Sequence, residues 1–213
     1  MNFDTLVRAV GALPCFDFPL LAQISTQKRE IIRVQLSRWM HQGKVISLRR
    51  GMYALAESYR RIPLTPAFLA NHLYSPSYLS GLWALGFHDR IPEKVVWLTN
   101  VTACVPRRFQ NPFGVFDYRH VKQEFFFGYR PEVFGNNEIL VAEPEKALLD
   151  HWHLTPGEWT TQRLEQMRFQ NNGLIKETRL RNFAQRWGSP RLTRAVERFF
   201  QSSEGEEQGT VTL

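Results

Sequence analysis

The sequence predicts an α+β fold, and three patterns support this class. Apolar residues recur at helical spacing in residues 3–41, alternating apolar and polar residues flank a basic turn within residues 44–55, and a longer region combines short strands with helices. With 213 residues, the chain can form one large or two small domains. Its hydrophobic fraction of 43% and charged fraction of 22% are typical of a globular protein.

The first domain is expected at residues 1–58, where the order of elements is that of a winged helix-turn-helix. We expect helices at residues 3–13, 18–24 and 27–41 and strands at residues 44–48 and 52–55. Ser25 or Thr26 can cap the third helix, and Gly43 can end it. Its apolar positions form a single stripe that should face the first two helices, namely Ile32, Leu36, Trp39 and Met40.

A larger mixed α/β domain is expected at residues 63–201, after a polar linker with two prolines at residues 57–66. Its strands form a small, mostly antiparallel sheet in this prediction, at residues 94–100, 114–122, 124–129 and 138–141. Its helices are expected at residues 66–74, 75–86, 144–154, 157–170, 176–187 and 190–201. Residues 202–213 are polar and acidic, so we expect them to be a disordered tail.

Positive charge is concentrated on the third predicted helix and the basic turn. Between Gln27 and Tyr53, seven Lys and Arg residues are opposed only by Glu30, giving +6 against +7 for the whole chain. With a sequence pI of about 9.7, this concentration indicates an anionic partner, and nucleic acid is the first candidate. The predicted DNA-contacting residues are Lys28, Arg29, Arg33, Val34, Ser37, Arg38, His41, Lys44, Arg49 and Arg50.

Within this set the expected roles differ. Arg33, Ser37 and Arg38 are directed to base edges, and Val34 to a thymine methyl group. The lysines and Arg29 are directed to phosphates, and the two arginines of the turn to a minor groove. The alternative is a solvated helix face on a winged helix that binds protein.

Other chemistries have weaker support. Two cysteines, Cys15 and Cys104, provide neither a disulfide framework nor a cysteine zinc site, so no metal or cofactor is expected. No apolar run reaches the roughly 20 residues of a membrane span, which predicts a soluble cytoplasmic protein without a membrane partner.

Glu143, Glu145 and Asp150 could be the carboxylates of a metal-dependent nucleic-acid enzyme. Acidic residues in the first turn of a helix are explained more simply by the helix dipole, so we expect no enzyme.

Five segments carry a family resemblance in the same order, namely LSRWMHQGKVISLRRGMYAL, YLSGLWALGFHDRIPEKVVWLTN, PFGVFDYRH, FFFGY and VAEPEKALLD. Together they resemble the AbiEi family, the antitoxins of type IV (AbiE) toxin–antitoxin systems, which are transcriptional regulators of viral defence. The resemblance covers about residues 1–155 well and the remainder loosely. It implies a winged helix that represses its own promoter, expected on repeated half-sites. It further implies a C-terminal domain that neutralises a nucleotidyltransferase-like toxin, directly or indirectly.

The C-terminal region adds a second basic block at residues 175–200. Its arginines could extend the DNA contact, meet an acidic toxin surface, or keep the protein soluble, and they are Arg179, Arg186, Arg194 and Arg198. A stand-alone regulator with a ligand-sensing C-terminal domain and no toxin is the further alternative.

Overall fold

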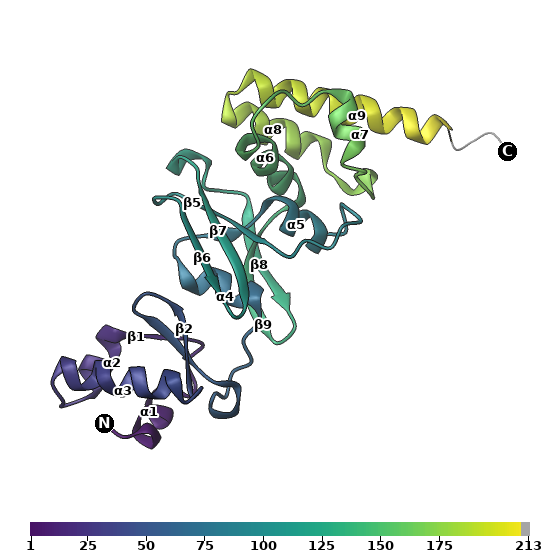
Figure 1. Ribbon diagram of the computed structural model, residues 1–213. Helices are drawn as coiled ribbons and strands as arrows, with labels where there is room; N and C mark the ends of the chain where they lie inside the picture. The colour runs from purple at the N-terminus through teal and green to yellow at the C-terminus, as the bar shows by residue number, and fades with distance from the viewer. Residues whose placement is uncertain (210–213) are drawn as a thin grey trace.

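The computed structural model describes residues 1–209 and has a mixed α+β architecture (Figure 1). The N-terminal elements occur in the predicted order, with one short strand added between the first two helices. They are α1 (Phe3–Val10), β1 (Phe16–Asp17), α2 (Phe18–Ile24), α3 (Arg29–His41), β2 (Val45–Arg49) and β3 (Met52–Leu55). The strands form an antiparallel sheet in the order β1-β3-β2.

The stripe predicted for α3 is confirmed. Ile32, Leu36 and Trp39 are buried, and they join α1, α2 and the small sheet in one hydrophobic cluster. Gly43 follows the helix with a φ of +67°, a conformation that glycine adopts without steric cost, so the predicted end is also confirmed.

The predicted cap of α3 is wrong. The N-cap is Lys28, whose side chain makes no capping hydrogen bond, and the helix begins at Arg29. The Ser25 hydroxyl instead accepts a hydrogen bond from the Gln27 amide at 3.2 Å, within the connection between the helices. A serine that closes a local turn is not available to a helix beginning four residues later.

The second part of the chain is built on a six-stranded sheet with the order β6-β7-β5-β4-β9-β8. The strands are β4 (Tyr78–Leu79), β5 (Leu98–Thr102), β6 (Arg107–Asn111), β7 (Gly114–His120), β8 (Tyr129–Phe134) and β9 (Asn137–Ala142). The pairs β4–β9 and β5–β7 are parallel, and the pairs β4–β5, β6–β7 and β8–β9 are antiparallel. The sheet is therefore more mixed than predicted.

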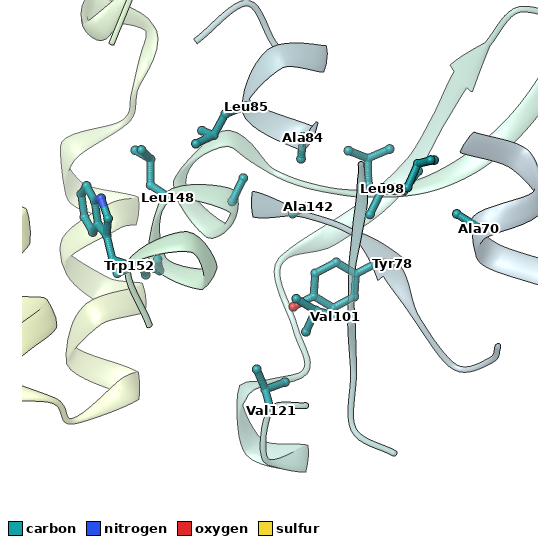
Figure 2. Packing of buried hydrophobic residues seen from close by; sticks show 14 of the residues in the cluster. Ala70, Tyr78, Ala84, Leu85, Leu98, Val101, Val121, Ala142, Leu148 and Trp152 are labelled. Carbon is teal, nitrogen blue, oxygen red and sulfur yellow. The ribbon is translucent and has the colours of Figure 1, made fainter. Parts of the chain in front are cut away.

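Helices cover this sheet and extend beyond it. They are α4 (Pro66–Leu73), α5 (Gly81–Phe87), α6 (Pro144–Leu154), α7 (Thr161–Gln166), α8 (Glu177–Trp187) and α9 (Pro190–Gly209), with 3-10 turns at Glu57–Tyr59, Gln123–Phe125 and Asn172–Leu174. Helices α6 to α9 gather at one end of the molecule, and α1 to α3 lie at the other (Figure 1). Figure 2 shows part of the core of the second part of the chain, where Leu85 of α5 lies near Leu148 of α6 and Tyr78 of β4 lies beside Val101 of β5.

Several predicted elements differ from the structure. The strand expected at residues 94–100 lies at Leu98–Thr102, the helix expected at residues 157–170 covers only Thr161–Gln166, and β6 and β8 were not predicted. The helix expected at residues 75–86 begins only at Gly81, because Tyr78 and Leu79 form a buried strand between β5 and β9. The strand expected at residues 124–129 is largely a 3-10 turn and a loop. Helix α9 continues to Gly209, past its predicted end, so the predicted disordered tail overlaps this helix, and its residues 210–213 lie outside the described part.

The two predicted domains share a packed boundary. Leu48 and Ala54 belong to the large hydrophobic cluster of the second part, although they lie on β2 and β3. Leu64, in the predicted linker, is only 9% exposed in the same cluster. The opposite side of the small sheet packs on α1 to α3 through Val45 and Leu55. The small sheet therefore lies between two cores, and residues 57–66 do not act as a free linker.

Candidate nucleic-acid interface

The buried stripe of α3 determines which of its side chains face outward. The exposed members are Arg29, Glu30, Ile31, Arg33, Val34, Ser37, Arg38 and His41. Val34 is 62% exposed. His41 is held in place because its Nδ1 lies 2.8 Å from the Ser37 carbonyl oxygen. The face thus combines guanidinium groups, a hydroxyl and an apolar side chain.

Six cations on or beside this face have no acidic partner. Among the side chains that the structure describes, every ion pair lies between Glu93 and Arg198, so none involves these residues. The six are Lys28, Arg29, Arg33, Arg38, Lys44 and Arg50; Lys44 is half-buried and the others are exposed. Unpaired cations on one surface repel each other, so this arrangement favours a polyanionic ligand.

Aromatic rings position two of these cations. The Arg33 guanidinium lies 5.2 Å from the centroid of the Phe18 ring on α2, and the Lys44 ammonium lies 4.9 Å from that of Phe3 on α1. A cation held over a ring keeps its N–H donors free for another acceptor. The helices behind α3 therefore orient its charged neighbours.

Two cations at the start of α3 reduce the stability of the helix. Its first residues include Lys28 and Arg29, with Glu30 as the acidic residue of the first turn. A cation near a helix N-terminus opposes the helix dipole and costs about 0.3–1 kcal/mol at an exposed site. The free N–H groups and the two cations point to the same use, because both attract an anion such as phosphate.

The Arg49 side chain contacts the second part of the chain, whereas the sequence predicted that it reaches a DNA groove. Its Nε donates to the Leu73 carbonyl at the end of α4 at 2.7 Å, and its guanidinium lies 5.9 Å from the centroid of the Phe109 ring on β6. The side chain therefore joins the small sheet to the second part of the chain. Of the two arginines expected at the tip, Arg50 remains exposed.

The four arginines predicted as further contacts all have partners inside the second part. Arg194 and Arg198 lie 2.8 and 3.1 Å from Glu158, and they lower the pKa of that carboxyl group to about 2. Arg179 pairs with Glu143 at 2.7 Å. Arg186 lies 3.8 Å from the centroid of the Phe127 ring. These contacts give each arginine a role in holding the helices together.

The carboxylates considered for catalysis are packed into the same region. Asp150 and Lys146 have no exposed side-chain surface and form an ion pair. The Lys146 ammonium also donates to the Tyr78 hydroxyl at 2.8 Å, and the hydroxyls of Tyr78 and Ser80 donate to Asp150 at 3.1 and 2.7 Å. Glu145, 2% exposed, accepts a hydrogen bond from the backbone amide of Lys176, the N-cap residue of α8.

This buried network was not recognised in the sequence, although the four-residue spacing of Lys146 and Asp150 within apolar neighbours was a usable signal. Burial lowers the pKa of Lys146, opposed by Asp150, and burial raises the pKa of Tyr78 well above its usual value. The network links α6 to the central strand β4, and its side chains are fully buried.

The aromatic triplet Phe125 to Phe127 is part of the core packing. Phe125 stacks on Trp187 with ring centroids 4.5 Å apart, Phe126 lies against Tyr78, and Phe127 contacts the ring of Phe183 edge-on. All three rings are half-buried, and each packs on another aromatic ring.

No group of three or more His, Cys, Asp or Glu within the described part is placed to hold a metal ion. None of its helices is both long and apolar enough to span a membrane. No protein-family model matches the chain, and no curated protein matches it either.

Proposed function

We propose that the N-terminal part is a winged helix-turn-helix and that the protein is a sequence-specific, double-stranded-DNA-binding transcriptional repressor. In this assignment α3 is the recognition helix, β2 and β3 form the wing, and β1 is the third strand of the wing sheet. The observation that carries the proposal is the exposed α3 face surrounded by six cations without acidic partners. The site of action is the cytoplasm, at repeated half-sites in the protein's own promoter.

The proposed contacts follow from groove chemistry. A helix with its side chains is about 10–12 Å across, and the major groove is about 12 Å wide, so α3 can lie in the groove with its outer face toward the bases. Arg33 and Arg38 can each donate two hydrogen bonds to a guanine, and Val34 can pack on a thymine methyl group. The remaining cations neutralise phosphates and add affinity without sequence information.

The test compares promoter binding by the wild type with that of the Arg33→Ala, Arg38→Ala variant. Each lost bidentate base contact costs about 1–3 kcal/mol, so the two together should weaken specific binding by at least about 30-fold. The control variant is Lys94→Ala, Lys176→Ala, which removes the same charge from two exposed positions outside the N-terminal part. Wild-type affinity in the α3 variant, measured by fluorescence anisotropy on a promoter duplex, would overturn the assignment.

We propose further that the protein is the antitoxin of a type IV toxin–antitoxin system and that it neutralises a nucleotidyltransferase-like toxin. This part rests on the resemblance of residues 1–155 to the AbiEi family. Expression of the full chain should restore growth to cells that produce the product of the neighbouring gene. The full chain is required because removing residues 1–60 would expose the surface that packs on Leu48 and Ala54.

The α3 variant separates the two activities. It should rescue growth as well as the wild type while failing to bind the promoter. Absence of rescue by well-folded wild-type protein would refute the antitoxin role and leave the DNA-binding role standing. A non-enzymatic protein should also release no product from DNA or RNA in the presence of Mg²⁺.

A further inference from the structure

The wing and the large sheet meet at two edge strands. Strand β2 is an edge of the small sheet and β6 is an edge of the large one. The Asn111 side chain of β6 donates to the Leu48 carbonyl of β2 at 3.1 Å, and Arg49 lies over Phe109. These contacts place the end of β2 beside β6, and Arg50 follows β2 directly in the turn.

The start of β6 carries two more exposed arginines. Neither Arg107 nor Arg108 forms an ion pair among the described residues. The Arg108 guanidinium lies 4.7 Å from the centroid of the Trp97 ring, and Trp97 is 55% exposed. Asp117 is the cross-strand partner of Arg108, but its carboxylate lies 3.5 Å from Arg119 instead.

We propose that Arg50, Arg107, Arg108 and Trp97 form a second DNA-contacting surface, which we term the β6 basic edge. It rests on the proposed function and extends it: the protein contacts the phosphate backbone beside the site read by α3, using residues of its second part. Three exposed guanidinium groups match the charge and geometry of phosphates. Stacking on Trp97 holds Arg108 with its N–H edge free.

The physical reason for this extension is the fixed position of the wing. Because Arg49 and Asn111 join β2 to α4 and β6, DNA that reaches the wing also comes close to β6. Contacts to phosphates are independent of sequence, so this surface should lengthen the bound stretch of DNA and raise affinity for every duplex equally.

The experiment measures how the dissociation constant changes with salt. Each neutralised phosphate contributes about 0.9 to the slope of log affinity against log salt, so Arg107→Ala, Arg108→Ala should lower the slope by about 1.8. Between 50 and 200 mM salt, the wild type should lose about 12-fold more affinity than this variant. The variant should weaken binding to a promoter duplex and to a random duplex of equal length by the same factor.

Three comparisons decide the outcome. The matched charge control, Lys94→Ala with Lys176→Ala, should keep the wild-type slope. If the β6 variant keeps the wild-type slope and affinity while the α3 variant loses promoter binding, the β6 basic edge is refuted and the proposed function stands. If the wild type does not prefer the promoter duplex over the random one and the α3 variant binds as the wild type does, both proposals fail.

Duplex length gives an independent readout. Shortening the promoter duplex stepwise from each end should remove the β6 contacts before the α3 contacts. Once the duplex is too short to reach the β6 basic edge, the affinity of the wild type should equal that of the Arg107→Ala, Arg108→Ala variant. The affinity of the variant should be the same as on the longer duplex. An equal loss for both proteins at every length would overturn the inference.

Discussion

The buried pair of Lys146 and Asp150 gives the sharpest test of how the second part is held together. Neither side chain has exposed surface, and the pair is tied to β4 through Tyr78 and Ser80. Lys146→Met keeps most of the side-chain volume but leaves Asp150 as a buried carboxylate without a cation. Breaking a buried ion pair in this way costs about 3–5 kcal/mol. This is a large part of the roughly 5–15 kcal/mol by which a domain is stable.

The assay is urea unfolding at neutral pH, followed by circular dichroism, on a double-mutant cycle of Lys146→Met and Asp150→Asn. We expect an interaction energy of about 2–3 kcal/mol, the upper part of the range for residues in contact. The chain contains a matched control: Arg181 and Glu177 have the same four-residue spacing on a helix, but their side chains are 46% and 52% exposed. That pair should contribute below about 0.5 kcal/mol.

Equal interaction energies in the two cycles would refute the reasoning, because burial is the difference between the pairs. A loss below about 1 kcal/mol for Lys146→Met would show that Asp150 is accommodated without its cation, which contradicts the cost expected for a buried unpaired charge.

Three further outcomes are expected. Burial lowers the pKa of His151 from 6.5 to about 4. Between these pH values the imidazole binds a proton in the unfolded chain but not in the folded one, so the free energy of unfolding should fall by up to about 3 kcal/mol as the pH drops from 6.5 to 4. In His151→Phe, the midpoint of urea unfolding should depend less on pH over this range. Arg49→Ala removes the hydrogen bond to Leu73 and should lower the free energy of unfolding by about 1–2 kcal/mol in a single transition, and two separated transitions would contradict the shared packing at this boundary. Thymines of the promoter site can be replaced one at a time by deoxyuridine, which lacks the methyl group. At one position this should weaken binding of the wild type by about 1 kcal/mol and leave binding of Val34→Ala unchanged. An equal loss of affinity for both proteins would show that Val34 does not contact a thymine methyl group.

Elements with strong periodicity or clear boundaries were predictable. The α6 helix has the predicted bounds because Pro144 at its start and the apolar spacing of its residues agree with its packing. The buried stripe and outward face of α3 followed from the same reasoning. Where local pattern and packing disagreed, the prediction failed. Tyr78 and Leu79 lie in a sequence that favours a helix, yet pairing on both sides makes them a central strand.

The candidate site also combines features that the sequence predicts with features that only the tertiary structure decides. The concentration of charge on residues 28–50 is a property of the sequence, and so is the separation of α3 into an apolar and a cationic face. The link between the wing and β6 could not be predicted from the sequence, because Leu48 and Asn111 are distant in the chain and only the tertiary packing brings them into contact.

The amino-acid sequence by itself determined the local elements of the N-terminal part, the charged face of α3 and the apolar character of α6, since each depends on neighbours within a few residues. Tertiary structure decided which of the cations remain free. Arg49 and Arg50 are equivalent in the sequence, but one donates to the Leu73 carbonyl and the other is exposed. Arg179 pairs with Glu143, and Arg194 and Arg198 share Glu158, which are carboxylates from distant segments. The sequence determines which residues are charged, whereas the groups that the fold brings within a few ångströms determine which of these charges can contact a ligand.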